Sequence, residues 1–157
     1  MTRDVELDAV LHETVDLIRD FLGCDSCLIY LLEEGELVLF ASTDATRSKV
    51  GKLRLQRSEG LTGWVARERR LVAISREAYN DPRFKFFKEL PQDMFEAFLS
   101  VPVISRNKVV GVINVQHREP RIHSGAEMEM LSTIGEQIGL LLVLSRLKSE
   151  LPAHVTV

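Results

Sequence analysis

The stretch from Phe98 to Glu119 reads FLSVPVISRNKVVGVINVQHRE and has the pattern of a β-hairpin that is apolar on both faces. Two runs rich in Val and Ile flank SRNK, where Arg106 and Asn107 can form a two-residue turn because Asn tolerates a positive φ. Direct pairing from that turn sets one row of side chains on each face. One face then carries Leu99, Val101, Val103, Val110, Val112, Asn114 and Gln116, and the other carries Phe98, Ser100, Pro102, Ile104, Val109, Gly111, Ile113 and Val115. Such a hairpin is predicted to lie inside a sheet that is covered on both sides.

Helices from both ends of the chain are predicted to cover one face. Over residues 3–22, apolar side chains recur every three or four positions, and Gly23 can close that helix in the left-handed conformation. The capping box Ser124-Gly-Ala-Glu127 begins a second helix over residues 125–150. The two inner stripes are Leu7, Leu11, Val15, Ile18 and Leu22, and Met128, Leu131, Ile134, Ile138, Leu141 and Leu142.

The region between these helices, residues 24–119, alternates strand patterns with turns. The strand patterns are CLIYLLEE and ELVLFAS around Gly35, then KLRLQR, then LVAIS, and a short helix in GLTGWVARERR precedes the last of them. Together with the hairpin they predict an α+β fold with a central antiparallel sheet of five to six strands. A chain of 157 residues fits one such domain, over residues 1–157.

The polar stretch from Ser75 to Ala97 contains two prolines, and five of the seven Phe residues of the chain fall in or beside it. Long irregular segments that carry large apolar groups are usually lids or binding loops, although a plain core under a loop is the alternative. Asn114 and Gln116 interrupt an apolar strand, so their amides either orient a ligand or occupy a solvent position at the strand end. The predicted ligand-binding residues are Trp64, Asp81, Phe84, Phe87, Phe95, Phe98, Asn114 and Gln116.

The composition is that of an ordinary soluble protein, with 45% hydrophobic and 27% charged residues. The net charge of -3 gives no electrostatic reason to expect nucleic acid or an anionic membrane. No apolar run approaches the ~20 residues of a membrane span, and MTRDVELD is too acidic for a signal peptide. Two cysteines cannot make a disulfide framework, so we expect a cytoplasmic location.

Motifs for metal or catalytic chemistry are weak. Cys24-Asp-Ser-Cys27 has the CxxC spacing, but no second pair follows, so we expect two buried, inert thiols on opposite faces of the first strand. Gly60 and Gly63 flank a helix start without the GK[ST] of a phosphate-binding loop. The four histidines, His12, His117, His123 and His154, show no metal spacing and are expected on the surface. We therefore predict no metal, no cofactor and no catalytic residue.

The order of the elements and several motifs resemble the GAF domain family over nearly the whole chain. The motifs are EGLTGWVARERRLVAI, the NDPRF turn, FLSVPVISRNKVVGVINVQ and the capped last helix. FxAFLxVPxIxR followed by GVxxVQxRE is similar to the N-terminal GAF domain of nitrogen-type phosphoenolpyruvate-protein phosphotransferases, and similar motifs occur in other bacterial regulators. The resemblance implies a GAF-like sandwich, with the N- and C-terminal helices on one face and short helices and loops over a small-molecule pocket on the other.

Three sharper functions of that family fit this sequence poorly. Cyclic-nucleotide-binding members carry an Asn-Lys pair, a Phe and an Asp-Glu, whereas the corresponding stretch here has Ile122 and Ala126 before Glu127 and no such pair. Bilin-binding members attach their pigment to a cysteine later in the domain, where this chain has none. Free-methionine sulfoxide reductases keep their cysteines in loops around the pocket, whereas Cys24 and Cys27 precede the first strand or open it.

The resemblance therefore predicts a non-enzymatic sensory or regulatory domain that binds an unknown small molecule and signals through its terminal helices to an output domain or partner protein. A ligand-free dimerisation module is the alternative, and a reductase-like redox enzyme is the less favoured one. Leu140, Leu144, Leu147 and Leu151 recur at heptad-like spacings on the side of the last helix opposite its inner stripe. Since one core cannot bury both stripes, we expect a homodimer through that helix.

Overall fold

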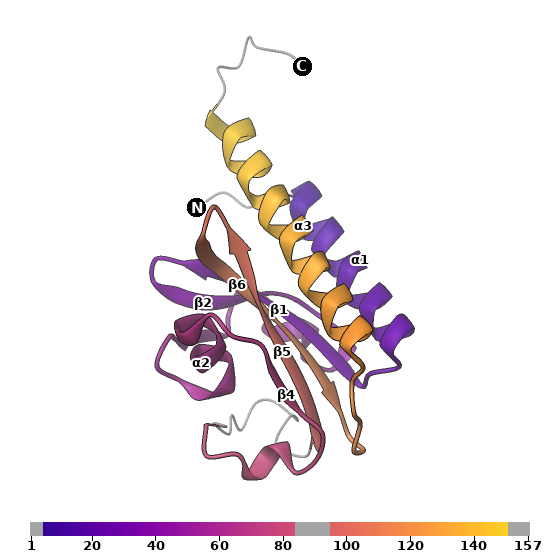
Figure 1. Cartoon of the computed structure of the whole chain (residues 1–157). Helices are drawn as coiled ribbons and strands as arrows, with labels where there is room; N and C mark the ends of the chain where they lie inside the picture. The colour runs from indigo at the N-terminus through magenta and orange to yellow at the C-terminus, as the bar shows by residue number, and fades with distance from the viewer. Residues whose placement is uncertain (1–4, 84–94, 151–157) are drawn as a thin grey trace.

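The computed structural model describes residues 5–83 and 95–150, which form the α+β fold shown in Figure 1. The helices are α1 (Val5–Leu22), α2 (Gly60–Glu68) and α3 (Gly125–Glu150), with short 3-10 turns η1 (Asp44–Lys49) and η2 (Ala78–Asn80). The strands are β1 (Ser26–Glu33), β2 (Glu36–Ser42), β3 (Arg54–Gln56), β4 (Val72–Ile74), β5 (Ala97–Ser105) and β6 (Lys108–His117). They form one antiparallel sheet in the order β3-β2-β1-β6-β5-β4, which confirms the predicted fold class.

Both faces of the sheet are covered, as the hairpin pattern predicted. In Figure 1, α1 and α3 lie side by side on one face, and α2 lies on the other. The core under α1 and α3 contains Leu99, Val101, Val103, Ile113 and Val115, with the predicted inner stripes of both helices except Leu141, which lines a groove between α1 and α3 instead. The core under α2 contains Leu28, Tyr30, Leu39, Leu61, Val65, Phe98 and Val112. Each face of the central hairpin therefore belongs to a different core.

The grouping of β5 and β6 side chains predicted from the sequence was wrong by one position. The turn lies at Arg106 and Asn107 as expected, with φ of 52° and 64°. Ile104 pairs with Val109, but Val103 pairs with Gly111, so an extra residue bulges from β6 between these pairs. Because a shift of one residue reverses which side chains share a face, Asn114 and Gln116 share theirs with Ser100 and Phe98. They do not share it with Leu99 and Val101.

The ends of the terminal helices follow the predicted signals. Gly23 has φ of 65°, and its N–H donates to the carbonyl oxygen of Arg19 at 2.8 Å, which closes α1. At the start of α3, Ser124 N–H donates to Glu127 Oε1 at 2.9 Å, and Glu127 N–H donates to Ser124 Oγ at 3.1 Å. These reciprocal bonds are the capping box, and they begin α3 at the predicted position.

Helix α3 is apolar on more than one side. Among the described helices it alone is long and apolar enough, by length and composition, to cross a bilayer, with a mean hydropathy of 1.3 in a window that is 28% buried. Core helices pass the same test, and α3 packs closely on β5 at Gly135 and Gly139. A Cβ added at Gly139 would lie 3.1 Å from the carbonyl oxygen of Ile104. The expectation that no segment spans a membrane stays a prediction.

Candidate functional site

Buried polar side chains gather on the α2 side of the sheet, across the three central strands. Ser26 and Phe98 pair with Gln116, while Leu28 and Ser100 pair with Asn114. Paired residues on neighbouring strands share a face, so these side chains form two adjacent rows. We call four of them, Ser26, Ser100, Asn114 and Gln116, the polar floor, and each is at most 4% exposed.

The Asn114 amide is held by two hydroxyl groups. Ser100 Oγ donates to Asn114 Oδ1 at 2.6 Å, and Asn114 Nδ2 donates to Thr62 Oγ1 at 2.7 Å. Thr62 comes from α2, so this side chain ties the helix to the sheet. At 2% exposed, Asn114 is not in the solvent position that was the alternative to a ligand-binding role.

Gln116, by contrast, is buried without a polar partner among the described residues. Its side chain is 2% exposed, and within residues 5–83 and 95–150 no group hydrogen-bonds to its amide. The hydroxyl of Tyr30, on the same side of the sheet, also lacks a partner in that part of the chain, and burial raises its pKa. A buried polar group without a partner costs about 1–3 kcal/mol, so a group that lacks one among the described residues is a candidate ligand contact.

Trp64 and Asp81, both predicted ligand-binding residues, contact the same arginine. The Arg83 guanidinium lies over the Trp64 ring, 4.6 Å from its centroid, and donates to both carboxylate oxygens of Asp81 at 2.9 and 2.8 Å. Hydrogen bonding from Arg83 lowers the pKa of Asp81, which keeps the carboxylate charged. This cluster anchors the chain at Arg83 onto α2, immediately before a segment that the structure does not describe.

A second arginine lies over a second aromatic ring at residue 95, where the second described range of the chain begins. Phe95 is buried, and the Arg118 guanidinium lies 5.0 Å from its ring centroid. The N–H of Glu96 donates to the carbonyl oxygen of His117 at 2.9 Å, which continues the pairing of β5 with β6. Phe98 is buried in the core under α2. Phe84 and Phe87 lie outside the described residues, so their predicted role stays a prediction.

The predicted dimer residues form an exposed apolar surface on α3. Leu140, Leu144 and Leu147 are each about half exposed, and Leu151 lies outside the described residues. A matching surface on α1, which was not predicted from the sequence, consists of the exposed side chains of Val10, Leu17 and Phe21. Val10 and Leu144 line one groove between the two helices. The spacing of seven from Val10 to Leu17 and of four from Leu17 to Phe21 is heptad-like, so this surface could have been predicted from the sequence.

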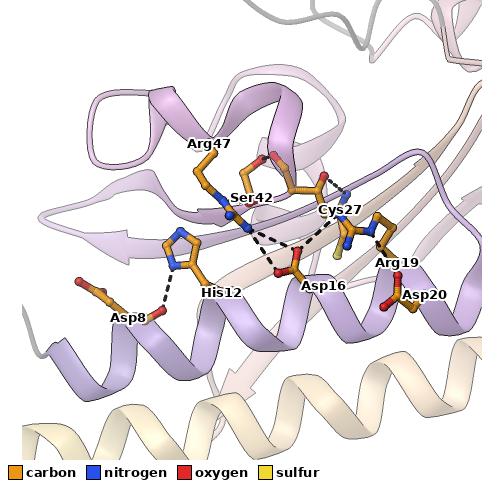
Figure 2. Close-up of polar contacts among 9 residues, drawn as sticks. Asp8, His12, Asp16, Arg19, Asp20, Cys27, Ser42 and Arg47 are labelled. Carbon is orange, nitrogen blue, oxygen red and sulfur yellow. Dashed lines mark hydrogen bonds and ion pairs between the residues drawn. The ribbon is translucent and has the colours of Figure 1, made fainter.

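Both cysteines are buried, as predicted, but they lie in the same core rather than on opposite faces. Cys24 and Cys27 belong to the core under α1 and α3, because Cys24 precedes β1 and does not follow strand alternation. Burial raises the pKa of Cys24 to about 11 and also raises that of Cys27. Figure 2 shows the pair of Arg47 and Asp16, which joins η1 to α1 over this region with an N–O distance of 3.4 Å.

Two histidines depart from the expected surface location. His117 ends β6 and His123 precedes the cap of α3, and both are buried with their rings in contact. His12 lies on α1, where its Nδ1 is 2.9 Å from the carbonyl oxygen of Asp8. Within the described ranges, no group of three or more His, Cys, Asp or Glu side chains could hold a metal ion.

The sequence of this chain matches a family model and several known proteins. The family model described as GAF domain matches residues 6–142. A curated relative, the phosphoenolpyruvate-dependent phosphotransferase system of Escherichia coli (strain K12), is 30% identical over 143 residues, which cover 90% of this chain and 19% of the relative. The chain thus spans about a fifth of the length of such relatives.

Solved structures extend the comparison. The GAF domain of an Acinetobacter phosphoenolpyruvate-protein phosphotransferase has a TM-score of 0.82 at 31% identity, covering 94% of this chain and 89% of that one. The corresponding domain from Coxiella burnetii has a TM-score of 0.85 at 26% identity, covering 92% and 87%. A type II free methionine-R-sulfoxide reductase from Thermoplasma acidophilum has a TM-score of 0.73 at 18% identity, covering 87% and 92%, and shares the fold alone.

Proposed function

Because this chain belongs to the GAF domain family, and resembles the GAF domains of phosphoenolpyruvate-protein phosphotransferases, we propose that it is a non-enzymatic regulatory domain of the bacterial cytoplasm. It binds a small molecule over the polar floor and passes the signal through α1 and α3 to an output domain or partner protein. Ligand binding acts by population shift, since a ligand that binds one conformer better increases its population.

The observation that carries this proposal is the buried Gln116 amide, for which residues 5–83 and 95–150 supply no partner. Its two N–H donors and its carbonyl oxygen can all bond a polar ligand, and Asn114 in the next row has hydrogen-bonding capacity left after its bonds to Ser100 and Thr62. A ligand that fills this capacity recovers the free energy lost by burying the amide. Gln116 therefore gives both affinity and orientation.

The position of the thiols argues against the redox alternative. The chain has two cysteines, and both lie under α1 and α3, on the side of the sheet opposite the polar floor. A thiol with a raised pKa is a poor nucleophile at neutral pH, because the thiolate is the reactive form. A substrate bound over Gln116 would meet neither sulfur.

The test uses a protein-free, small-molecule extract of bacterial cells as the probe. Fractions are added to the wild-type chain, to Gln116→Leu and to Gln56→Leu, which changes an exposed amide on β3. We expect at least one fraction to raise the melting temperature of the wild type and of Gln56→Leu but not of Gln116→Leu. Gln116→Leu removes an amide that has no partner among the residues that the structure describes, so its own melting temperature should not fall. No shift with any fraction would contradict ligand binding.

We propose dimerisation as a second function, carried by the exposed apolar surfaces of α1 and α3. The exposed stripe of α3 is Leu140, Leu144 and Leu147, and the exposed stripe of α1 is Val10, Leu17 and Phe21. Val10 and Leu144 line one groove between the two helices. A second copy of the chain presents the same two stripes, so a four-helix interface would bury both at once. Such an interface would also carry the signal to an attached output domain.

A further inference from the structure

A small groove lies between α1 and α3, near the start of α1 and the end of α3. Four apolar side chains line it, two from each helix: Leu7, Val10, Leu141 and Leu144. Its rim carries Glu6 and Lys148, whose side chains are paired at an O–N distance of 3.2 Å. The groove measures about 190 Å³, and a cavity of about 150 Å³ with a similar apolar lining can hold benzene. This α1–α3 groove therefore has room for one aromatic ring.

Phe21 presents an exposed aromatic ring on the same pair of helices. Its side chain is 71% exposed, and that of Leu17, one turn earlier on α1, is 62% exposed. An aromatic side chain buries a large apolar area and has few rotatable bonds, so such side chains are typical anchors of protein interfaces. Phe21 and Leu17 therefore form a protruding apolar surface that a partner can cover.

The groove and Phe21 lie at opposite ends of the helix pair. Lys148, near the end of α3, pairs with Glu6, near the start of α1. Arg121, just before α3, donates from Nη1 to the carbonyl oxygen of Leu22 at the end of α1, at 2.7 Å. The two helices therefore run side by side in opposite directions (Figure 1). About 16 Å of helix separates Phe21 from the part of α1 that lines the groove, so Phe21 cannot enter the groove of its own chain.

We propose that Phe21 of each copy inserts into the α1–α3 groove of the other copy in the dimer. The inference rests on the proposed dimerisation and specifies which surfaces meet. In a two-fold symmetric pair, the contact from the first copy to the second is repeated from the second to the first, so both rings are covered at once. This reciprocal arrangement sets a protruding ring into a hollow. Pairing each end with its own copy would set ring against ring and groove against groove.

The charges along α1 agree with the reciprocal arrangement. Three exposed acidic residues recur every seven positions along this helix: Glu6, Glu13 and Asp20. Residues seven apart lie on one face of a helix, so these carboxylates form a row beside Leu17. Packing α1 against α1 of the second copy would bring two such rows together, and like charges across an interface oppose binding. The reciprocal arrangement instead brings Asp20, next to Phe21, to the rim that carries Lys148.

The first experiment cross-links cysteines placed at the rim of the groove and beside Phe21. Glu6→Cys changes the rim, and Asp20→Cys changes the residue before Phe21, both at exposed positions. Each variant alone, and an equal mixture of the two, is treated with a short bis-maleimide at a concentration where light scattering gives the mass of a dimer. We expect linked dimers from the mixture and a loss of linking in either variant alone. Wild type under the same conditions is the control for the buried thiols of Cys24 and Cys27.

The second experiment measures the dissociation constant of the dimer. Phe21→Ala empties both grooves, so the constant should rise about a hundredfold. Ile122→Ala is the matched control, because Ile122 is 82% exposed but lies outside both helices, and it should leave the constant unchanged.

The outcomes separate the reciprocal arrangement from dimerisation itself. A wild-type dimer in which Asp20→Cys links readily to its own copy, or in which Phe21→Ala leaves the dissociation constant unchanged, would overturn the arrangement and leave dimerisation standing. A mass that grows beyond two copies would indicate an open chain of copies and would overturn the reciprocal contact. A monomeric wild type would contradict both the proposed dimerisation and this arrangement.

Discussion

Asn114 Nδ2 donates a 2.7 Å hydrogen bond to Thr62 Oγ1 and so joins two residues that lie 52 positions apart in the sequence. The bond connects α2 to the centre of the sheet, and Ser100 Oγ completes it by donating to Asn114 Oδ1. All three side chains are buried. Removing any one of them leaves a buried polar group without its partner, which is more costly than removing a pair together.

We predict that Asn114→Leu and Thr62→Val each lower the free energy of unfolding by about 1–3 kcal/mol. Either change breaks the same hydrogen bond between Asn114 and Thr62. The double variant should therefore lose less free energy of unfolding than the two single losses added together. Urea unfolding of the four proteins measures this coupling. Thr14→Val is the control, since its exposed hydroxyl bonds only within α1, to the carbonyl oxygen of Val10. Additive losses would show that the bond contributes nothing.

This polar cluster marks how far the sequence could predict the site. Side-chain periodicity and the capping box predicted α3 at its observed bounds, and alternation along β6 grouped Asn114 with Val112, which lies in the core under α2. The prediction of which β5 side chains share its face was wrong, because a run of Val and Gly does not indicate the β-bulge near Gly111. A bulge depends on pairing between strands, and the pattern of one strand does not contain it.

The histidine pair was missed for a related reason. His117 follows a buried strand and His123 precedes a helix cap, and a lone histidine at each position is usually exposed. Their contact depends on how the connection between β6 and α3 folds back, which is set by Arg121 reaching Leu22 and Glu127. A side-chain bond that closes a loop has no periodic signal in the sequence.

The thiols of Cys24 and Cys27 should react slowly in the native protein. Burial hides both sulfurs and raises both pKa values, so the thiolate is scarce at neutral pH. We expect a disulfide reagent to label neither thiol rapidly in buffer and both within the mixing time in urea. Rapid labelling of either thiol under native conditions would contradict this and would favour the redox alternative.

Gly111→Ala should destabilise the sheet strongly. A Cβ at this position would lie 2.4 Å from the carbonyl oxygen of Tyr30 on the neighbouring strand, so the backbone itself must move. We expect a loss of about 1–3 kcal/mol or more in the free energy of unfolding, measured with urea. Gly135→Ala is the matched control, because its Cβ would meet nothing closer than 3.6 Å and Ala is the better helix former. Equal effects of the two changes would contradict the close approach at Gly111.

The free energy gained by burying exposed apolar side chains indicates which helices form the interface of the proposed dimer. Leu140, Leu144 and Leu147 are already about half buried, so covering each would yield about 1 kcal/mol. Three such leucines from each copy give about 6 kcal/mol, which falls within the association cost of roughly 4–15 kcal/mol. The α3 stripe alone is therefore marginal. Leu17 and Phe21 of α1 are 62% and 71% exposed and would add the missing apolar area.

We therefore predict that the wild-type chain is a dimer at micromolar concentration and that both helices contribute to its interface. Leu144→Glu with Leu147→Glu should give the mass of a monomer by light scattering, and Leu17→Glu with Phe21→Glu should do the same. Ile122→Glu is the matched control, because Ile122 is 82% exposed but lies in the connection before α3, so the dimer should persist. A dimer that survives the α1 change but not the α3 change would restrict the interface to α3. A monomeric wild type would remove the interface, because nothing would then cover the two stripes.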